Sequence, residues 1–396
     1  MTALRALADP LPFDYTARAQ AIAAVAATHA ETVDRDSRFP AETFAAIREQ
    51  RLLGIMVPRE WGGEAASLAE VADICYRLGQ ACSSSAMIFA MHHIKVACIA
   101  RHCHGSPWHQ DLLRRLCREQ LLLASSTTEG QQGGNARASA APVEVVGERF
   151  TLDRQATVIS YGVAADGVVT TARRSPDAPP SDQVLVVLLK PDYTLDPLMG
   201  WDTLGMRGTC SAGFALHAAA DTEQIMPVPY EKIHAQTMVP VAHLTWSSLW
   251  AGIAAAAVER ARQFIRGAAR QAGGQVPPAA AHYTKAVASL STLRGMIAAA
   301  IERYESVRDD ETRLMSLEFQ SMINLTKVEA SEGAVETVMH AMRACGLSGY
   351  RNDGPHSIGR YLRDVLSSPL MINNDRILAN VANASLMSPV AATLSS

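Results

Sequence analysis

Val184-Leu185-Val186-Val187-Leu188-Leu189 is the clearest of several short apolar runs in the middle of the chain, and the zone that contains these runs decides the fold. Valine and threonine are frequent in them, and the loop Pro179-Pro180-Ser181-Asp182 precedes the last one, a pattern typical of short antiparallel strands joined by turns. We expect strands at residues 150–152, 156–160, 168–172 and 184–189. The sequence therefore predicts a small β domain over residues 121–235.

Helical patterns flank this β domain on both sides. Before it, residues 84–100 place their apolar side chains at the spacing of one helix face. After it, residues 279–308 and 316–344 are helical stretches longer than ordinary globular helices. We therefore expect an α+β fold with an N-terminal helical domain over residues 1–120, a central β-barrel-like domain over residues 121–235, and a C-terminal four-helix bundle over residues 236–396.

Composition excludes several classes of protein. The chain has 396 residues, of which 48% are hydrophobic and 19% charged, so it is not disordered and has material for a large core. A net charge of -3 without a basic cluster argues against nucleic-acid binding. We expect no signal peptide and no membrane span, because the most apolar window, residues 249–258, is too short. Seven scattered cysteines indicate reduced thiols in the cytoplasm.

Two glycine-containing segments are candidate ligand loops. In Thr127-Thr128-Glu129-Gly130-Gln131-Gln132-Gly133-Gly134-Asn135, glycines allow a close backbone approach and hydroxyls can hold a polar ring or an anion. In Gly205-Met206-Arg207-Gly208-Thr209, the arginine offers a planar fork to a phosphate or carboxylate. The alternatives are a surface loop and a turn with a surface arginine. His102-Cys103-His104 predicts no metal site, because adjacent side chains point to different helix faces.

Four motifs in this order resemble those of the acyl-CoA dehydrogenase superfamily of flavoproteins, over nearly the whole chain. Val57-Pro58-Arg59-Glu60-Trp61-Gly62-Gly63 is similar to the family's N-terminal signature, and Thr128-Glu129 with Gly133-Gly134-Asn135 is similar to its flavin loop. The segment that begins at Gly205 is similar to a Gly-x-Arg-x-Ser/Thr motif. Gly346-Leu347-Ser348-Gly349-Tyr350 followed by Arg363-Asp364 is similar to the C-terminal tail.

This resemblance implies an FAD cofactor between the β domain and the helical bundle. It also implies a homodimer or homotetramer, in which Arg270 reaches the pyrophosphate held by a neighbouring subunit. By matching position, Thr128 and Ser160 should meet the flavin ring, where donors stabilise negative charge on the reduced flavin. The full set of expected cofactor-binding residues is Thr128, Gly133, Gly134, Ser160, Arg207, Arg270, Arg343 and Gly346.

The resemblance fails at the catalytic base. Most members use a glutamate eight residues after the aspartate of the Arg-Asp pair, and counting from Asp364 gives Ile372. Other members carry the base on the first bundle helix, where the matching stretch, residues 242–246, has no acid. If the register shifts, Asp375 is the only nearby carboxylate; the alternative is that Asp375 is a surface or helix-capping residue. His243 is the other candidate base.

Three hypotheses about function follow. The first is dehydrogenation of an acyl thioester, carried by CoA or a carrier protein, with electrons passed to a partner protein or to O2. The second is a flavin-dependent monooxygenase of the same fold, which does not need the glutamate and protects its chemistry by excluding solvent. The third is a non-catalytic flavoprotein. From the sequence we favour the first, because the Arg-Asp tail and the N-terminal signature look closer to the dehydrogenases.

Overall fold

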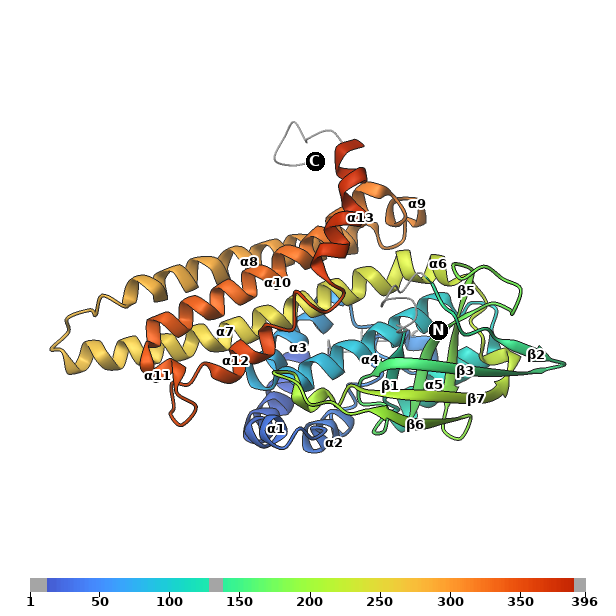
Figure 1. The fold of residues 1–396 in the computed structure, drawn as a ribbon, viewed down its shortest axis with the longest axis horizontal. Helices are drawn as coiled ribbons and strands as arrows, with labels where there is room; N and C mark the ends of the chain where they lie inside the picture. Colours follow the sequence, from blue (N-terminus) through green and yellow to red (C-terminus); the bar gives the residue numbers. More distant parts are fainter. Residues whose placement is uncertain (1–12, 128–137, 388–396) are drawn as a thin grey trace, which may run out of the picture.

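The computed structural model describes residues 13–127 and 138–387. Its elements run from helices through strands to helices again (Figure 1), which confirms the predicted α+β fold. The helices of the first part are α1 (Tyr15–Arg35), α2 (Ala41–Glu49), α3 (Leu68–Ala81), α4 (Ser83–His102) and α5 (Pro107–Glu119).

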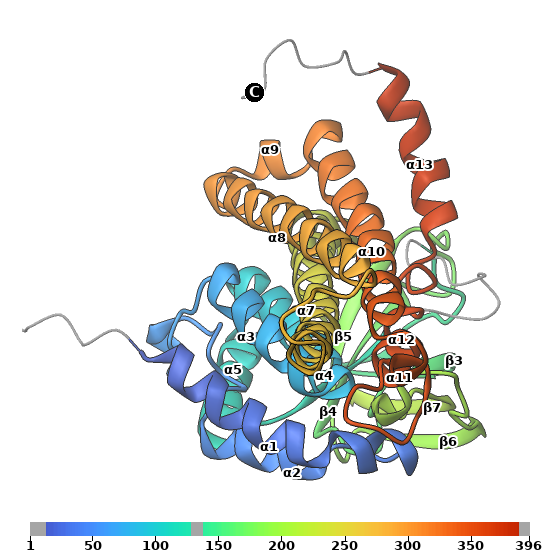
Figure 2. The same ribbon diagram turned by 90° about the vertical axis from the view of Figure 1, so that its left-hand side faces the viewer.

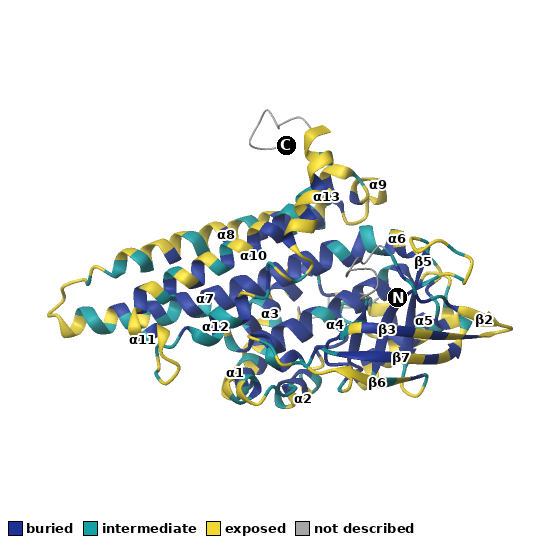
Figure 3. Cartoon of the chain, viewed as in Figure 1, coloured by how far each residue is buried: buried dark blue, intermediate teal, exposed yellow. Residues whose placement is uncertain are grey.

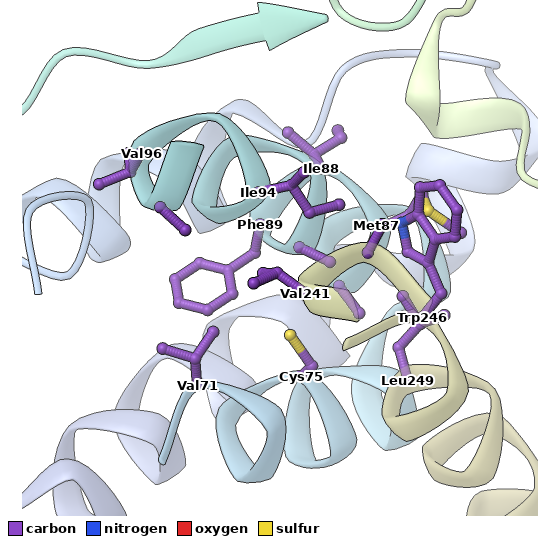
Figure 4. Close-up of a cluster of buried hydrophobic side chains, with 14 of the residues drawn as sticks. Val71, Cys75, Met87, Ile88, Phe89, Ile94, Val96, Val241, Trp246 and Leu249 are labelled. Atoms are coloured by element: carbon purple, nitrogen blue, oxygen red, sulfur yellow. The ribbon is translucent and has the colours of Figure 1, made fainter. Parts of the chain in front are cut away.

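Helix α4 is the centre of this arrangement. It contacts α3, strand β1 (Leu123–Ser126) and helix α7 (Val239–Gln271), and only Met91 and Arg101 in it are not buried. A helix that is apolar on all sides belongs in a core. In Figure 4, Phe89 of α4 lies between the neighbouring helices, and Trp246 of α7 lies beside Met87 of α4. The interior therefore joins the first and last helical parts directly.

The strands form two sheets. A three-stranded sheet has the order β1-β4-β5, and a four-stranded antiparallel sheet has the order β2-β3-β7-β6. Strand β1 runs parallel to β4, with Ser126 opposite Thr170, so the expectation of antiparallel pairing alone is wrong at this position. The remaining strands are β2 (Glu144–Val146), β3 (Arg149–Ile159), β4 (Gly167–Arg173), β5 (Gln183–Leu189), β6 (Tyr193–Met199) and β7 (Ala212–Asp221).

The last part of the chain consists of long helices around α7. Figure 2 shows α7 in the middle, with α3, α8 and α10 around it. Helix α13 stands away from this group and packs on α10 through Val328, Ile377 and Val381. The elements are α6 (Tyr230–Ile233), the π-helix η5 (His234–Met238), α7, α8 (Ala280–Val307), α9 (Glu311–Leu314), α10 (Leu317–Cys345), α11 (Leu347–Tyr350), α12 (Gly359–Val365) and α13 (Asn374–Met387).

The continuous helix Tyr230–Gln271 contains an apolar window of 18 residues, longer than the window of residues 249–258 noted in the sequence. By length and composition it could cross a membrane, but 94% of its apolar 18-residue window is buried inside the protein. Figure 3 shows the first two thirds of α7 mostly in the buried class and its C-terminal end partly exposed, whereas α8 is largely exposed. The apolar character of α7 is that of a core helix.

Candidate functional site

A chain of hydroxyl groups ends at Ser160, one residue after β3. The hydroxyl oxygens of Ser160 and Ser211 lie 2.8 Å apart, and those of Thr209 and Ser211 lie 2.7 Å apart. Ser160 is 5% exposed. Thr209 Oγ1 also lies 2.8 Å from the Met206 carbonyl oxygen, which anchors the chain to the backbone. Chained hydroxyls strengthen one another, and each has one proton and two lone pairs with which to meet a polar ligand.

The segment that carries this chain is fixed by the C-terminal Arg-Asp pair. Met206 N–H donates to Asp364 Oδ1 at 2.7 Å, and burial raises the pKa of the Asp364 carboxyl. A Cβ on Gly205 would lie 2.1 Å from the Arg363 carbonyl oxygen, so only glycine allows this close approach. The conformation of the segment thus depends on a residue 158 positions away in the sequence.

Arg207 is part of the same junction. Its Nε donates to the Asp34 carbonyl at 2.9 Å, and its terminal nitrogen donates to the Thr203 carbonyl at 2.9 Å and to Asp202 at 3.3 Å. The Asp34 carboxylate in turn pairs with Arg363. In this structure Arg207 therefore joins α1 to the β part, and its role as a flavin ligand stays a prediction.

A second hydroxyl, that of Ser126, lies at the end of β1. Its Oγ is buried and has no hydrogen-bond partner among the described residues, while its carbonyl accepts from Thr170 Oγ1 at 2.8 Å. An orphaned buried hydroxyl directly before the glycine-rich loop fits a ligand with a polar edge. The predicted loop residues Thr128, Gly133 and Gly134 lie outside the described residues. Sequence reasoning missed Ser126, although its position beside that loop was a signal.

An apolar cleft of about 410 Å³ adjoins the hydroxyl chain. Tyr161 and Ala212, which line it, are the sequence neighbours of Ser160 and Ser211. The rest of the lining comes from the corner between α1 and α2, from segments that connect the strands, and from β7: Ser37, Phe39, Val163, Ala164, Trp201, Cys210 and Phe214. The β part thus offers an apolar surface next to a hydroxyl donor.

The helical part contributes a group of buried polar atoms on α7. His243 Nδ1, Trp246 Nε1 and Trp250 Nε1 are buried without a hydrogen-bond partner in the described parts of the chain. Spacings of three and four residues put these three side chains on one helix face, and the rings of His243 and Trp246 lie 6.0 Å apart. Unpaired buried polar atoms, donors or acceptors, are costly in a folded protein and call for an explanation such as a ligand.

Lys327 of α10 completes this group, which we call the imidazole–ammonium cluster (His243, Trp246, Trp250, Lys327 and Asn374). The Lys327 ammonium donates to Asn374 Oδ1 at 2.7 Å and to the Ile372 carbonyl at 3.1 Å, and lies 5.7 Å from the Trp250 ring centroid. Burial lowers the pKa of Lys327 to about 8. Burial, and next the charge of Lys327, lower the pKa of His243 to about 3, so this imidazole is neutral near pH 7.

The carboxylates beside this cluster lie outside it. Asp375 is exposed in the first turn of α13, whereas its neighbour Asn374 is the side chain that points inward. Glu332 accepts from Asn374 Nδ2 at 3.1 Å and is also exposed. The structure thus brings His243 together with Lys327, which the sequence analysis missed, and leaves Asp375 at the surface.

Three of the predicted cofactor-binding residues lie at the other end of the molecule. Arg270 near the end of α7 and Arg343 near the end of α10 are exposed, as is Gly346, which has a φ of +56°. Figure 1 shows that the α7–α8 turn and α11 lie far from the strands. Arg270 and Arg343 are therefore remote from Ser160 of the same chain.

Comparison with known proteins gives the family. Two family profiles match: "Acyl-CoA dehydrogenase, N-terminal domain" at residues 13–120 and "Acyl-CoA dehydrogenase, C-terminal domain" at residues 235–386. The chain is 24% identical to 3-sulfinopropanoyl-CoA desulfinase of Paraburkholderia xenovorans (strain LB400), over 88% of each chain. It is also 24% identical to cyclohex-1-ene-1-carbonyl-CoA dehydrogenase of Geobacter metallireducens, over 92% of this chain and 94% of that one.

A solved structure has the same fold. The crystal structure of FMN-bound TdsC from Paenibacillus sp. A11-2, a dibenzothiophene monooxygenase, matches with a TM-score of 0.83 and 18% sequence identity. The match covers 96% of this chain and 98% of that chain. At this identity the likeness concerns the fold.

Proposed function

The chain belongs to the acyl-CoA dehydrogenase family, and on that premise we propose that it is a flavin-dependent monooxygenase of this fold. The observation that carries the proposal is the composition of the imidazole–ammonium cluster: a neutral imidazole and a buried ammonium, with both adjoining carboxylates exposed. Abstraction of an α-proton requires a base within hydrogen-bond reach of the carbon. Neither exposed carboxylate meets this requirement, so we now favour a monooxygenase over the dehydrogenase that the sequence favoured.

The described residues fit a flavin. Ser126 and Ser160 offer hydroxyls at the ends of β1 and β3, and Trp246 offers an unpaired indole N–H. The edge of a flavin ring alternates carbonyl and N–H groups, which matches such donors. When bound in its reduced form, the flavin supplies two electrons to O2, so that one oxygen atom enters the substrate and the other leaves as water.

The side chains of the cluster have distinct roles in this proposal. The Lys327 ammonium stabilises negative charge that develops in the site, because its position is fixed in advance by Asn374 and the Ile372 carbonyl. His243 is neutral and presents Nδ1 to the substrate as a hydrogen-bond partner. Trp246 and Trp250 exclude water, which strengthens the electrostatic effect of Lys327.

The second candidate function is dehydrogenation of an acyl thioester with His243 as the base. It is favoured by the free Nδ1 of a neutral, buried imidazole, which can accept a proton. It is opposed by the pKa of about 3, which makes His243 a weak base.

One experiment separates the two functions. The flavin-loaded protein is mixed with acyl-CoA thioesters of several chain lengths without O2, and in parallel the reduced protein is mixed with ¹⁸O2 and candidate apolar substrates. We expect no loss of the oxidised-flavin absorbance in the first arm and ¹⁸O in the product of the second. Rapid bleaching by a thioester without O2 contradicts the proposal.

Asp375→Asn is expected to leave turnover within about threefold of wild type, since Asp375 is exposed and outside the cluster. A proton-abstracting carboxylate would cost on the order of 10²- to 10⁴-fold when neutralised. Steady-state turnover of the variant measures the difference. Asp309→Asn, which neutralises an exposed carboxylate between α8 and α9, is the matched control.

Ser211→Ala is expected to weaken flavin binding about fivefold, equivalent to one net hydrogen bond of about 1 kcal/mol, because Ser160 loses the hydroxyl that orients it. The dissociation constant is obtained by fluorescence titration. Ser211→Thr keeps the hydroxyl and should bind as wild type does. Equal affinities of all three proteins would show that the hydroxyl chain does not act on the flavin.

The adenosine half of the cofactor belongs to the same proposal. Arg270 and Arg343 are exposed cations at the end of the bundle remote from the strands. If the cofactor is FAD, these residues serve the flavin of a neighbouring subunit in a homodimer or homotetramer. Exposed Leu347 and Tyr350, 72% and 74% accessible, lie beside Gly346 and support such a contact. If the cofactor is FMN, neither arginine is needed.

A further inference from the structure

Lys95 of α4 is a buried cation without an adequate partner. The residue is 3% exposed, and the hydrogen bond that its ammonium makes in the described structure is to the thioether sulfur of Met238, at 3.7 Å. A thioether is a weak acceptor, and an ammonium has three protons to donate. A buried charge without a partner costs several kcal/mol, so a protein keeps one where it serves a purpose.

The surroundings of Lys95 contain no compensating carboxylate among the described contacts. Burial lowers the pKa of Lys95 to about 8, and the smaller contribution of the Cys98 thiol acts in the opposite direction. On the opposite element, Tyr230 donates its hydroxyl to the same Met238 sulfur at 3.2 Å. Met238 ends the π-helix η5, a type of element that is frequent at functional sites.

Lys95 lies one turn beyond Met91, the one residue in the middle of α4 that is not buried. Met91 is partly exposed, although the residues on both sides of it are buried. Residues four apart share a helix face, so Met87, Met91 and Lys95 form a row. Figure 4 shows Trp246 of the imidazole–ammonium cluster beside Met87, the first member of this row. The row therefore leads from that cluster to Lys95, over about 12 Å of helix.

We propose that Lys95 binds a carboxylate or carbonyl oxygen at the far end of the substrate, whose apolar body lies along Met87 and Met91. The inference rests on the proposed function, because it takes the imidazole–ammonium cluster as the reacting end. The substrate is then an apolar compound about 12 Å long with an acceptor oxygen at the end that does not react. The ammonium gains the charge-assisted hydrogen bond that Met238 does not supply.

The test compares octanoate with octan-1-ol on wild type and on Lys95→Met, which keeps the length of the side chain and removes its charge. Binding is measured by calorimetry on the flavin-loaded protein. We expect the variant to bind octanoate at least about tenfold more weakly and octan-1-ol as wild type does. The melting temperature of the ligand-free variant should rise, because an unpaired buried charge has been removed. Lys285→Met, on the exposed surface of α8, is the control.

The results that would overturn the role of Lys95 differ from the result that would contradict the proposed function. Equal affinity of wild type and Lys95→Met for octanoate, or an equal loss for both probes, overturns the inference. A lower melting temperature of the variant overturns it too, because the ammonium would then be a structural partner. Loss of flavin binding in the variant alone also contradicts it, by placing Lys95 at the cofactor. Failure of wild type itself to bind flavin contradicts the proposed function, and the two probes are then compared on the protein without flavin.

Discussion

Lowering the pH from 7 to 5 should destabilise the fold by several kcal/mol, because five buried histidines are neutral in the folded protein. Burial is the largest cause of the lowered pKa in each case. The pKa is about 4 for three of them, about 3 for His243, and well below the usual value for His93. The set is His92, His93, His102, His109 and His243.

The sign follows from proton binding in the two states. Below pH 6.5 the unfolded chain takes up protons at these imidazoles, while the folded chain does not until about pH 4. Each histidine therefore removes at most about 1.4 kcal/mol per pH unit in this window. Five acting together give an upper limit of about 7 kcal/mol per unit. Above pH 6.5 the effect vanishes, since both states are neutral.

His92 shows the physical reason most clearly. Its Nδ1 accepts from Leu123 N–H at 3.0 Å, and its Nε2 lies 2.8 Å from the Leu53 carbonyl. A protonated ring could not accept at Nδ1 and would lose the bond to β1. Urea unfolding at pH 7, 6 and 5 measures the effect. The side chain in His92→Gln keeps one acceptor and one donor and does not titrate. The unfolding free energy of this variant should therefore fall less steeply with decreasing pH, by the contribution of one histidine, at most about 1.4 kcal/mol per pH unit. A stability that is flat down to pH 5 would mean that these histidines are not buried as described.

Replacing Lys327 by methionine should lower the oxygenation rate on the order of 10²-fold, since a fixed charge aimed at the reacting group is worth several kcal/mol in a site that excludes water. The substitution removes the ammonium that bonds Asn374 and the Ile372 carbonyl. The measurements are kcat with a substrate identified by ¹⁸O incorporation, and the melting temperature as a check on folding. Lys285→Met again serves as the control.

A pH profile separates this role from a purely structural one. Because burial lowers the pKa of Lys327 to about 8, the wild-type rate should fall as the pH rises through 8 and the ammonium becomes neutral. Lys327→Met should lack that limb. A variant that keeps both the rate and the limb would show that Lys327 takes no part in the reaction, and a large loss in Asp375→Asn would restore the carboxylate base.

Much of the fold was predictable because its local signals were strong. The apolar run at residues 184–189 became β5, and the helical stretch at residues 316–344 became α10. Strand β7 was missed because its sequence is rich in alanine, which favours helix; pairing with β3 and β6 overrides that preference. The parallel pairing of β1 with β4 depends on distant residues and left no local signal.

The site was less predictable, for geometric reasons. Counting along the tail gave Ile372, and only a shifted register indicated Asp375. In the structure Asn374 is the residue that faces inward, since a step of one residue along a helix turns the side chain by about 100°. Lys327 lies in the middle of a long helix and only packing shows what it meets. Ser160 was identified through the family resemblance, whereas the support from Thr209 and Ser211 appeared only in three dimensions.

Flavin binding at the ends of β1 and β3 is the claim on which the rest depends. The direct measurement is a titration of FMN and FAD, each in oxidised and reduced form, with wild type and with Ser126→Ala/Ser160→Ala. Wild type should bind one flavin per chain. Binding of the oxidised form is followed by saturable quenching of flavin fluorescence, and binding of the reduced form by protection from reoxidation. The double variant should bind at least about tenfold more weakly. Wild type that binds neither flavin in either redox state, or a double variant with unchanged affinity, would contradict the account.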